Sequence, residues 1–345
     1  MPEIIRENPF IENLASSYIP DRTLIICAVL LAFIVTVILC PIVIPVLHRM
    51  KFGQPIREEG PQSHKKKEGT PTMGGVMILI GFIISALVFA GGNSDAVAVI
   101  LITIGYGIVG FVDDFLKVVK KQNEGLTPLQ KIIFQLAVTV LFYLYIVKSG
   151  AGTEIYIPFT KGVFIDLGIL YAPFLFFVMV GTVNSVNLTD GLDGLASGVT
   201  VLVTVFFLFV ALGANILGLT YVCGAMIGAL MGFLVFNCHP AKVFMGDTGS
   251  LALGGFIASI AILTKMPVML VIVGFIYVCE SLSVIIQVTY FKLTHGKRIF
   301  KMAPIHHHFE LCGLEGIKVV QLFWIVTAVM CLIGYIAAKG ALFIN

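Results

Sequence analysis

Long apolar stretches separated by short polar segments constrain this chain more than any other feature of its sequence. About 20 consecutive apolar residues cross a bilayer as a helix, and 58% of the 345 residues are hydrophobic while only 12% are charged. A mean hydropathy of +1.02 excludes an ordinary soluble domain. The sequence therefore predicts an all-α polytopic membrane protein, organised as one membrane domain over residues 1–345 with ten transmembrane helices. The expected spans are 23–47, 73–91, 95–112, 129–148, 169–186, 195–213, 217–236, 249–264, 268–292 and 318–339.

The loops between these spans differ in charge from one face of the membrane to the other. Sixteen of the 22 Lys and Arg residues lie in the second, fourth, sixth, eighth and tenth polar segments or at the span ends beside them. Basic residues accumulate in short cytoplasmic loops, so this face is predicted to be cytoplasmic and both termini extracytoplasmic. On the opposite face, residues 154–167 contain two strand-like segments around Thr160-Lys161-Gly162, which predicts a small extracytoplasmic β-hairpin.

Two features of the spans predict how helices pack. Gly224, Gly228 and Gly232 form a stripe of small residues that lets a neighbouring helix approach closely. The segment Gly105–Gly110 matches the GxGxxG dinucleotide fingerprint, but it lies within a predicted span rather than between a strand and an amphipathic helix, so helix packing is the better interpretation. The seven cysteines form no CxxC pair and suggest neither a disulfide framework nor a cysteine zinc site.

Two adjacent carboxylates, Asp113 and Asp114, follow the apolar run 95–112. An ionised side chain at mid-bilayer costs roughly 2.5–3.5 kcal/mol, so a charged pair at a span requires a reason. One reason is that the pair marks the point where a helix meets water. A functional reason gains weight because three more aspartates belong to segments assigned to the same face: Asp190, Asp193 and Asp247. Five carboxylates on one face suit Mg²⁺, a hard cation that prefers oxygen ligands.

Each of the other acidic stretches also has a structural interpretation. Asp190 and Asp193 are three residues apart beside Gly191 and Gly194, a composition that ordinary turns share. Their spacing nevertheless places both carboxylates on one side of a helical turn, and the glycines allow a ligand to approach the backbone. Asp247 precedes the eighth span and could serve as its N-cap.

Histidines and lysines on the same face complete the set of candidate groups. Three consecutive histidines, His306–His308, cannot easily all reach one zinc ion, and donation to a phosphate or acid–base chemistry is a more natural role. Lys117 and Lys131 follow the Asp pair, where they are either solvated basic residues or partners of phosphate groups. Carboxylates that hold Mg²⁺ beside lysines that neutralise phosphate are what a metal–diphosphate site requires.

Five motifs in this order resemble the bacterial phospho-N-acetylmuramoyl-pentapeptide transferases, within the polyprenyl-phosphate N-acetylhexosamine-1-phosphate transferases. They are Thr70-Pro71-Thr72-Met73-Gly74-Gly75, the pair Asp113-Asp114, Asn187 to Gly194, Phe244 to Ser250, and Pro304 to Glu310. The resemblance covers essentially the whole chain, and the last motif favours the muramoyl-pentapeptide branch. It implies a homodimer in the bacterial cytoplasmic membrane with a cytoplasm-facing cleft, which moves phospho-MurNAc-pentapeptide from UDP to undecaprenyl phosphate and yields lipid I and UMP. The implied partners are these two substrates and membrane lipid, with no nucleic acid.

The same resemblance implies roles for individual residues. Asp247 corresponds to the Mg²⁺ ligand, and the catalytic set is Asp113, Asp114, Asp247 and His306. Because neighbouring residues on a helix point about 100° apart, Asp113 and Asp114 are expected to differ in role, with Asp114 acting on the acceptor phosphate and Asp113 supporting it. The remaining positions are expected to bind substrate: Lys67, Thr72, Lys117, Lys131, Asn187, Asp190, Asp193, Asn237, Phe244, Gln287, His307 and His308.

Two other functions remain open on the sequence. A related enzyme of the same superfamily would use UDP-N-acetylglucosamine as its sugar donor. An ion-coupled transporter would use intramembrane carboxylates as proton relays, but it should spread them through the membrane depth, whereas Glu280 alone lies deep within a predicted span. The sequence assigns no role to Glu280.

Overall fold

The computed structural model describes residues 21–49, 69–120 and 125–342, and this part of the chain is mostly helical. The predicted site residue Lys67 lies outside the described residues. The long helices are α2 (Asp21–Arg49), α4 (Gly75–Ala90), α5 (Ser94–Lys120), α6 (Pro128–Ser149), α7 (Tyr171–Thr189), α8 (Leu195–Gly213), α9 (Leu217–Asn237), α10 (Gly246–Leu263), α12 (Phe275–Leu293) and α14 (Gly316–Leu342). The shorter ones are η2 (Gly168–Leu170), η3 (Pro267–Met269), α11 (Leu270–Val273) and α13 (Ile305–Leu311).

Nine of the helices in the described ranges are long and apolar enough to cross a membrane, which confirms the prediction of a polytopic membrane protein. The predicted span 73–91 corresponds to α4, an apolar helix of 16 residues. At 1.5 Å per residue, α4 covers about 24 Å, less than the hydrocarbon core of roughly 30 Å. A tenth span at α4 therefore stays a prediction.

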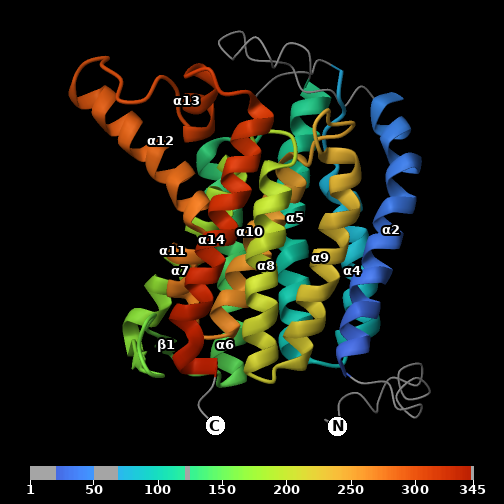
Figure 1. Ribbon diagram of the computed structural model, residues 1–345, viewed down its shortest axis with the longest axis vertical. Coiled ribbons are helices and arrows are strands. Elements are labelled where there is room, and N and C mark those ends of the chain that lie inside the picture. Colours follow the sequence, from blue (N-terminus) through green and yellow to red (C-terminus); the bar gives the residue numbers. More distant parts are fainter. Residues whose placement is uncertain (1–20, 50–68, 121–124, 343–345) are drawn as a thin grey trace.

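Two helices differ in extent from the predicted spans in ways that matter for the site. Helix α5 does not end at residue 112 but continues to Lys120, so Asp113 and Asp114 lie within the helix rather than beyond it. The predicted span 268–292 is divided at Gly274 into η3 and α11 on one side and α12 on the other. After this break α12 leans away from the other helices (Figure 1).

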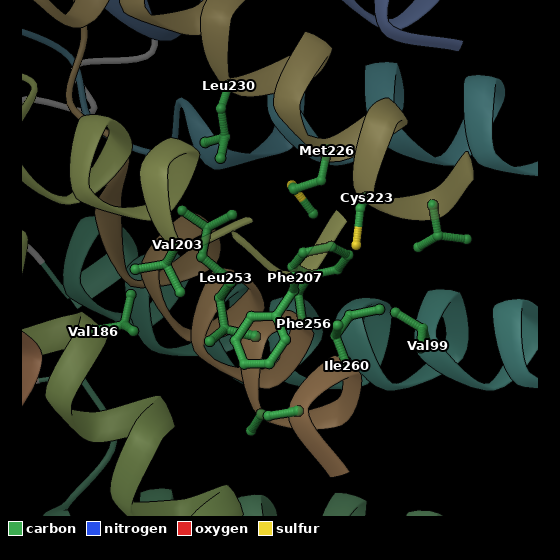
Figure 2. Packing of buried hydrophobic residues seen from close by; sticks show 14 of the residues in the cluster. Val99, Val186, Val203, Phe207, Cys223, Met226, Leu230, Leu253, Phe256 and Ile260 are labelled. Carbon is green, nitrogen blue, oxygen red and sulfur yellow. The ribbon is translucent and has the colours of Figure 1, made fainter. Parts of the chain in front are cut away.

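Helix α10 lies at the centre of the bundle and is the most buried of the nine candidate spans. Its Leu253, Phe256 and Ile260 side chains interlock with Phe207 of α8 and Met226 of α9 (Figure 2). Without water to expel between helices in a bilayer, such close packing is a main source of helix association. The most buried helix thus also carries Asp247 near its first residue, which fixes the position of that carboxylate.

The glycine stripe of α9 packs where its sequence predicts. Gly224, Gly228 and Gly232 all face α2, and a Cβ on Gly228 would lie only 2.0 Å from the carbonyl oxygen of Val29. Because that distance admits no side chain, the close contact of α2 with α9 depends on glycine. The predicted packing role of the stripe is confirmed.

Two short strands, β1 (Glu154–Tyr156) and β2 (Phe164–Asp166), pair in antiparallel register with Ile155 opposite Ile165. The pair lies at the end of the bundle where α2 begins and α14 ends, and α13 lies at the opposite end (Figure 1). Lys265 forms an ion pair of 2.5 Å with Glu154 and lowers the pKa of that carboxyl. The side of the membrane on which these strands lie stays a prediction.

Candidate functional site

The site begins with the two carboxylates of α5, which are almost fully buried. Asp113 is 2% exposed and Asp114 is 1% exposed. Their side chains have different partners, as neighbouring positions on a helix require. Asp113 accepts a hydrogen bond of 2.9 Å from the backbone of Leu126 and forms an ion pair of 2.6 Å with Lys117, one turn further along α5.

Asp114 binds the first turn of α10 with both carboxylate oxygens. Its Oδ2 accepts from the backbone N–H of Thr248 at 2.9 Å and from the Thr248 hydroxyl at 2.7 Å, and its Oδ1 accepts from the N–H of Asp247 at 3.2 Å. The first N–H groups of a helix have no intrahelical partners and carry partial positive charge. Asp114 therefore caps α10 from outside that helix and fixes its start against α5.

Two glycines allow α5 and α10 to come this close. A Cβ on Gly110 would lie 2.0 Å from the carbonyl oxygen of Asp247, so no other residue fits there without moving α10. Gly246 has a φ of +74°, in the left-handed region that favours glycine, and a Cβ there would lie 2.7 Å from an Asp114 oxygen. Gly110, which is the last glycine of the GxGxxG match, thus serves helix packing, as the sequence indicates.

Asp247 lies between two lysines. Its Oδ2 accepts from Lys117 of α5 and from Lys131 of α6, each at 2.8 Å. Its Oδ1 accepts from the side chain of Asn187 at 2.7 Å, and Asn187 also donates to the hydroxyl of Ser250 at 2.8 Å. Four helices, α5, α6, α7 and α10, therefore hold this one carboxylate in place.

Local sequence explains how Lys131 reaches the site. Helix α6 begins with a capping box, in which the Thr127 side chain accepts from the N–H of Gln130 and the Gln130 side chain accepts from the N–H of Thr127. Pro128 follows at the first helical position, where its missing N–H costs nothing. The cap fixes the first turn, and Lys131 projects from it toward Asp247.

The carboxylates of Asp113, Asp114 and Asp247 offer ligand atoms that all lie within 4.8 Å of one another. Together with Lys117 and Lys131 they form a compact group of alternating charge, the aspartate–lysine cluster. Three carboxylates against two ammonium groups leave a net negative charge, and oxygen donors in this number suit a hard divalent cation such as Mg²⁺. The residues present therefore fit a magnesium ion.

The expected set of five carboxylates divides in the structure. Asp190 and Asp193 are not part of the aspartate–lysine cluster; Asp193 accepts from the His239 ring at 3.0 Å and from the N–H of Ala241 at 3.2 Å. Asp193 thus joins the segment after α7 to the segment after α9. Asp190 lies in the turn that ends α7, with its N–H bound to the carbonyl of Asn187.

Asn237 and Thr72 serve the backbone around the site. The buried Asn237 side chain accepts from the N–H of Gly194 and the Ser197 hydroxyl and donates to the carbonyl of Val243, at 3.0–3.2 Å. These bonds use its two polar atoms to hold two loops together. The buried Thr72 hydroxyl lies next to Gly246, in a segment whose neighbouring residues pair with the backbone of Phe244 and Met245.

The three histidines point to three different partners. The Nδ1 atom of His306 lies 3.0 Å from Glu280, and that of His307 lies 3.1 Å from Glu310. His308 accepts a hydrogen bond of 3.1 Å from the backbone of Lys301. This divergence agrees with the sequence argument that three consecutive histidines do not share one ion.

Gln287 fixes the segment between α12 and α13. Its side-chain oxygen accepts from the N–H groups of Ile299 and Phe300, and its side-chain nitrogen donates to the carbonyl of Phe300. Gln287 thus fixes the backbone around Ile299 and Phe300, in the segment that precedes the three histidines. Sequence reasoning singled out Gln287 but not this bonding.

Sequence reasoning missed three groups that the structure brings to the site. Thr248 and Ser250 hold Asp114 and Asn187, and His239 binds Asp193. Hydroxyl residues in the first turn of a helix after an aspartate are a recognisable signal for such contacts. His239 carried no signal, because its partner lies far away in the sequence.

Comparison with known proteins gives consistent matches over most of the chain. A family model described as glycosyl transferase family 4 matches residues 96–265, and one described as phospho-N-acetylmuramoyl-pentapeptide-transferase signature 1 matches residues 67–79. The phospho-N-acetylmuramoyl-pentapeptide-transferase of Halalkalibacterium halodurans is 53% identical over 89% of this chain and 94% of its own length. The proteins of that name from Geobacillus sp. and Staphylococcus carnosus are 50% and 51% identical, over 90% and 88% of this chain and 96% of their own lengths.

Proposed function

Because the chain belongs to the phospho-N-acetylmuramoyl-pentapeptide-transferase family, we propose that it transfers phospho-MurNAc-pentapeptide from UDP-MurNAc-pentapeptide to undecaprenyl phosphate, forming lipid I and UMP. The observation that carries this proposal is the aspartate–lysine cluster at one end of the helix bundle. A site at helix ends suits a reaction in which one substrate is soluble and the other has its chain in the bilayer.

The chemistry sets the requirements for such a site. The acceptor phosphate must attack a diphosphate, so that one anion approaches another, and the site must lower this repulsion. A magnesium ion held by Asp247 would neutralise diphosphate charge. Lys117 and Lys131 already converge on Asp247 at 2.8 Å and are placed to exchange this carboxylate for phosphate oxygens.

The geometry favours different roles for the two aspartates of α5 from those expected on the sequence. Asp114 has both oxygens engaged by the start of α10, which suits a supporting role. Asp113 has one oxygen on Leu126 and the other beside Lys117, whose flexible side chain can move away. We therefore propose that Asp113 acts on the acceptor phosphate and that Asp114 holds Asp247 in position.

The nucleoside is proposed to bind beside this cluster, between the segments after α7 and after α9. Phe244 would stack on uracil, and Asp190 and Asp193 would contact the nucleoside. The bonds of Asn237 and Asp193 support this placement, because they hold the two segments together. His307 and His308 would contribute to the phosphate side, and Lys67 is proposed as a further substrate contact.

The proposal includes a location in the membrane. The charge bias of the loops supports a bacterial cytoplasmic-membrane protein with its site on the cytoplasmic side, both termini outside and α4 as a tenth span. The strands β1 and β2 then lie on the extracytoplasmic side, since they lie opposite α13 (Figure 1). A homodimer is proposed from family membership.

Release of UMP by purified protein tests the proposal. In detergent with undecaprenyl phosphate and Mg²⁺, we expect UMP from UDP-MurNAc-pentapeptide, loss of turnover with EDTA and its recovery when Mg²⁺ is added in excess. Asp247→Asn should abolish turnover while the protein still elutes as folded, and the matched variant Asp166→Asn, on β2, should leave turnover unchanged.

Other outcomes would identify the alternatives. UMP from UDP-N-acetylglucosamine alone would indicate the related transferase. Release of UMP from UDP-MurNAc-pentapeptide in detergent, without any ion gradient, would exclude an ion-coupled transporter. Near-normal turnover of Asp247→Asn at saturating Mg²⁺ would refute the metal assignment.

A further inference from the structure

Glu280 is a buried acidic residue that the transfer chemistry described above does not use. It lies on α12, within a candidate membrane span, and is 0% exposed. A buried charge is costly unless another group pairs with it. Its side chain therefore calls for a specific partner, and its sequence neighbours on α12 offer it no basic group within one turn.

That partner is His306, the second residue of α13. The Nδ1 atom of His306 lies 3.0 Å from Oε1 of Glu280, and the His306 side chain is only 1% exposed. A carboxylate only accepts hydrogen bonds, so an ionised Glu280 requires the proton to be on Nδ1. The contact thus orients the ring and fixes the direction in which Nε2 points.

The other ring nitrogen faces the turn after α7. A Cβ built on Gly191 would lie 2.1 Å from Nε2 of His306, so the ring occupies the space that any side chain at residue 191 would need. Within residues 21–49, 69–120 and 125–342, neither Nε2 of His306 nor Oε2 of Glu280 has a hydrogen-bond partner, although both atoms are buried. Most buried polar atoms have a hydrogen-bond partner, so this unpartnered ring nitrogen beside Gly191 requires an explanation.

A second contact ties the same helix to α7. The hydroxyl of Ser281 donates to the hydroxyl of Ser185 at 2.6 Å, one turn before α7 ends. Helix α12 is therefore linked to the 190–194 segment in two indirect ways: Ser281 contacts α7, which precedes the segment, and Glu280 contacts His306, whose ring lies beside Gly191. Since α12 otherwise leans away from the bundle (Figure 1), these contacts set its position at the site.

We propose that Glu280 is a positioning residue, which holds the His306 ring with Nε2 directed at the Gly191 backbone and so fixes one wall of the substrate site. Glu280 does not touch the reacting phosphates and acts only through His306. Gly191 belongs to the same unit, because only glycine leaves room for the ring. The kinetic test of this inference rests on the proposed function, whereas the hydrogen-exchange test does not.

A double-mutant cycle tests whether Glu280 acts through His306. Glu280→Ala should lower kcat by about tenfold to 100-fold, by analogy with the loss seen when residues that orient metal-binding histidines are removed. Glu280→Gln should retain more turnover than Glu280→Ala, because its amide oxygen still accepts from Nδ1. In a His306→Ala background, Glu280→Ala should cause no further loss.

The control is Ser283→Ala on the same helix. Its hydroxyl is buried and donates to the backbone carbonyl of Glu280, so its loss disturbs α12 without touching the Glu280 carboxylate, and turnover should stay near wild type. Equal losses from Glu280→Ala in both backgrounds would overturn the proposal, since they would show an effect independent of His306. Wild-type turnover of Glu280→Ala, or no advantage of Gln over Ala, would overturn it as well.

Hydrogen exchange tests the structural part without any turnover. Amide exchange in the peptide covering 187–195 should be faster in Glu280→Ala and in Gly191→Ala than in wild type, and unchanged in Ser283→Ala. If the wild-type protein released no UMP but this exchange pattern held, the proposed function would fail and the positioning role would stand. Unchanged exchange in Glu280→Ala would overturn the positioning role even in an active enzyme.

Discussion

Replacing Asp114 with asparagine should destabilise the protein as well as inactivate it. Asp114 accepts three hydrogen bonds from Asp247 and Thr248 at the start of α10, at 2.7–3.2 Å. Asparagine turns one acceptor oxygen into a donor that faces N–H or O–H groups. A lost hydrogen bond to a charged group costs about 1.5–3 kcal/mol, and the lost attraction to the helix N-terminus adds about 1 kcal/mol.

These losses sum to about 2.5–4 kcal/mol, which corresponds to several degrees of apparent melting temperature for a chain of this size. Thermal unfolding in detergent, followed by fluorescence of the single tryptophan or by size-exclusion chromatography after heating, measures the shift. The comparison variant is Asp113→Asn, which should lose turnover with a smaller change in stability. Its oxygens contact one backbone N–H, Lys117 at 2.6 Å and Lys131 at 3.8 Å, and they do not cap a helix.

The reasoning would be refuted if Asp114→Asn melted at the wild-type temperature, or if Asp113→Asn were the less stable of the two. Either result would mean that Asp114 does not hold α10 in place. Asp114 would then regain the role at the acceptor phosphate that its sequence motif suggests.

Three further changes test other parts of the structure. Gly110→Ala should cost about 1–3 kcal/mol through overpacking and should reduce turnover, because its Cβ would lie 2.0 Å from the Asp247 carbonyl; wild-type kinetics would contradict the close approach. Asn237→Ala should cost about 3 kcal/mol of stability, because three buried hydrogen bonds are lost. It should raise KM for the nucleotide substrate more than it lowers kcat. An unchanged KM would contradict the proposal that Asn237 holds the two loops together. Lys265 lowers the pKa of Glu154 in the folded protein. The stabilisation from this pair is therefore present above the pKa that Glu154 has in the unfolded chain, and it is lost as the pH falls through the pKa of the folded protein. Glu154→Gln should reduce the acid sensitivity of the melting temperature, and an identical pH profile would exclude the contribution.

Much of the candidate site could be predicted from sequence, because its residues lie in short motifs. The motifs around Asp113 and Asp247 include residues that meet in the structure, and Lys117 and Lys131 join them as the charge argument suggests. The sequence could not show which aspartates share a cluster. Asp193 has the same charge and was assigned to the same face, yet it binds the segment after α9.

The apolar runs by themselves determined that this protein is a membrane helix bundle, because backbone groups in lipid must be satisfied within helices and the length of a run reports whether it can cross. The spacing of Gly224, Gly228 and Gly232 likewise determined a packing face, since a repeat of four residues stays on one side of a helix.

Only the tertiary structure decided the partners of Asp114, Asn237 and Glu280. Each of these side chains is defined by a partner from a distant segment: the start of α10, the segments around Gly194 and Val243, and the ring of His306. A local pattern reports how a residue faces along its own helix, but not which other helix packs there. The chemistry of a buried polar group depends on that second fact, because its charge and hydrogen bonds are satisfied by whatever the packing brings within about 3 Å.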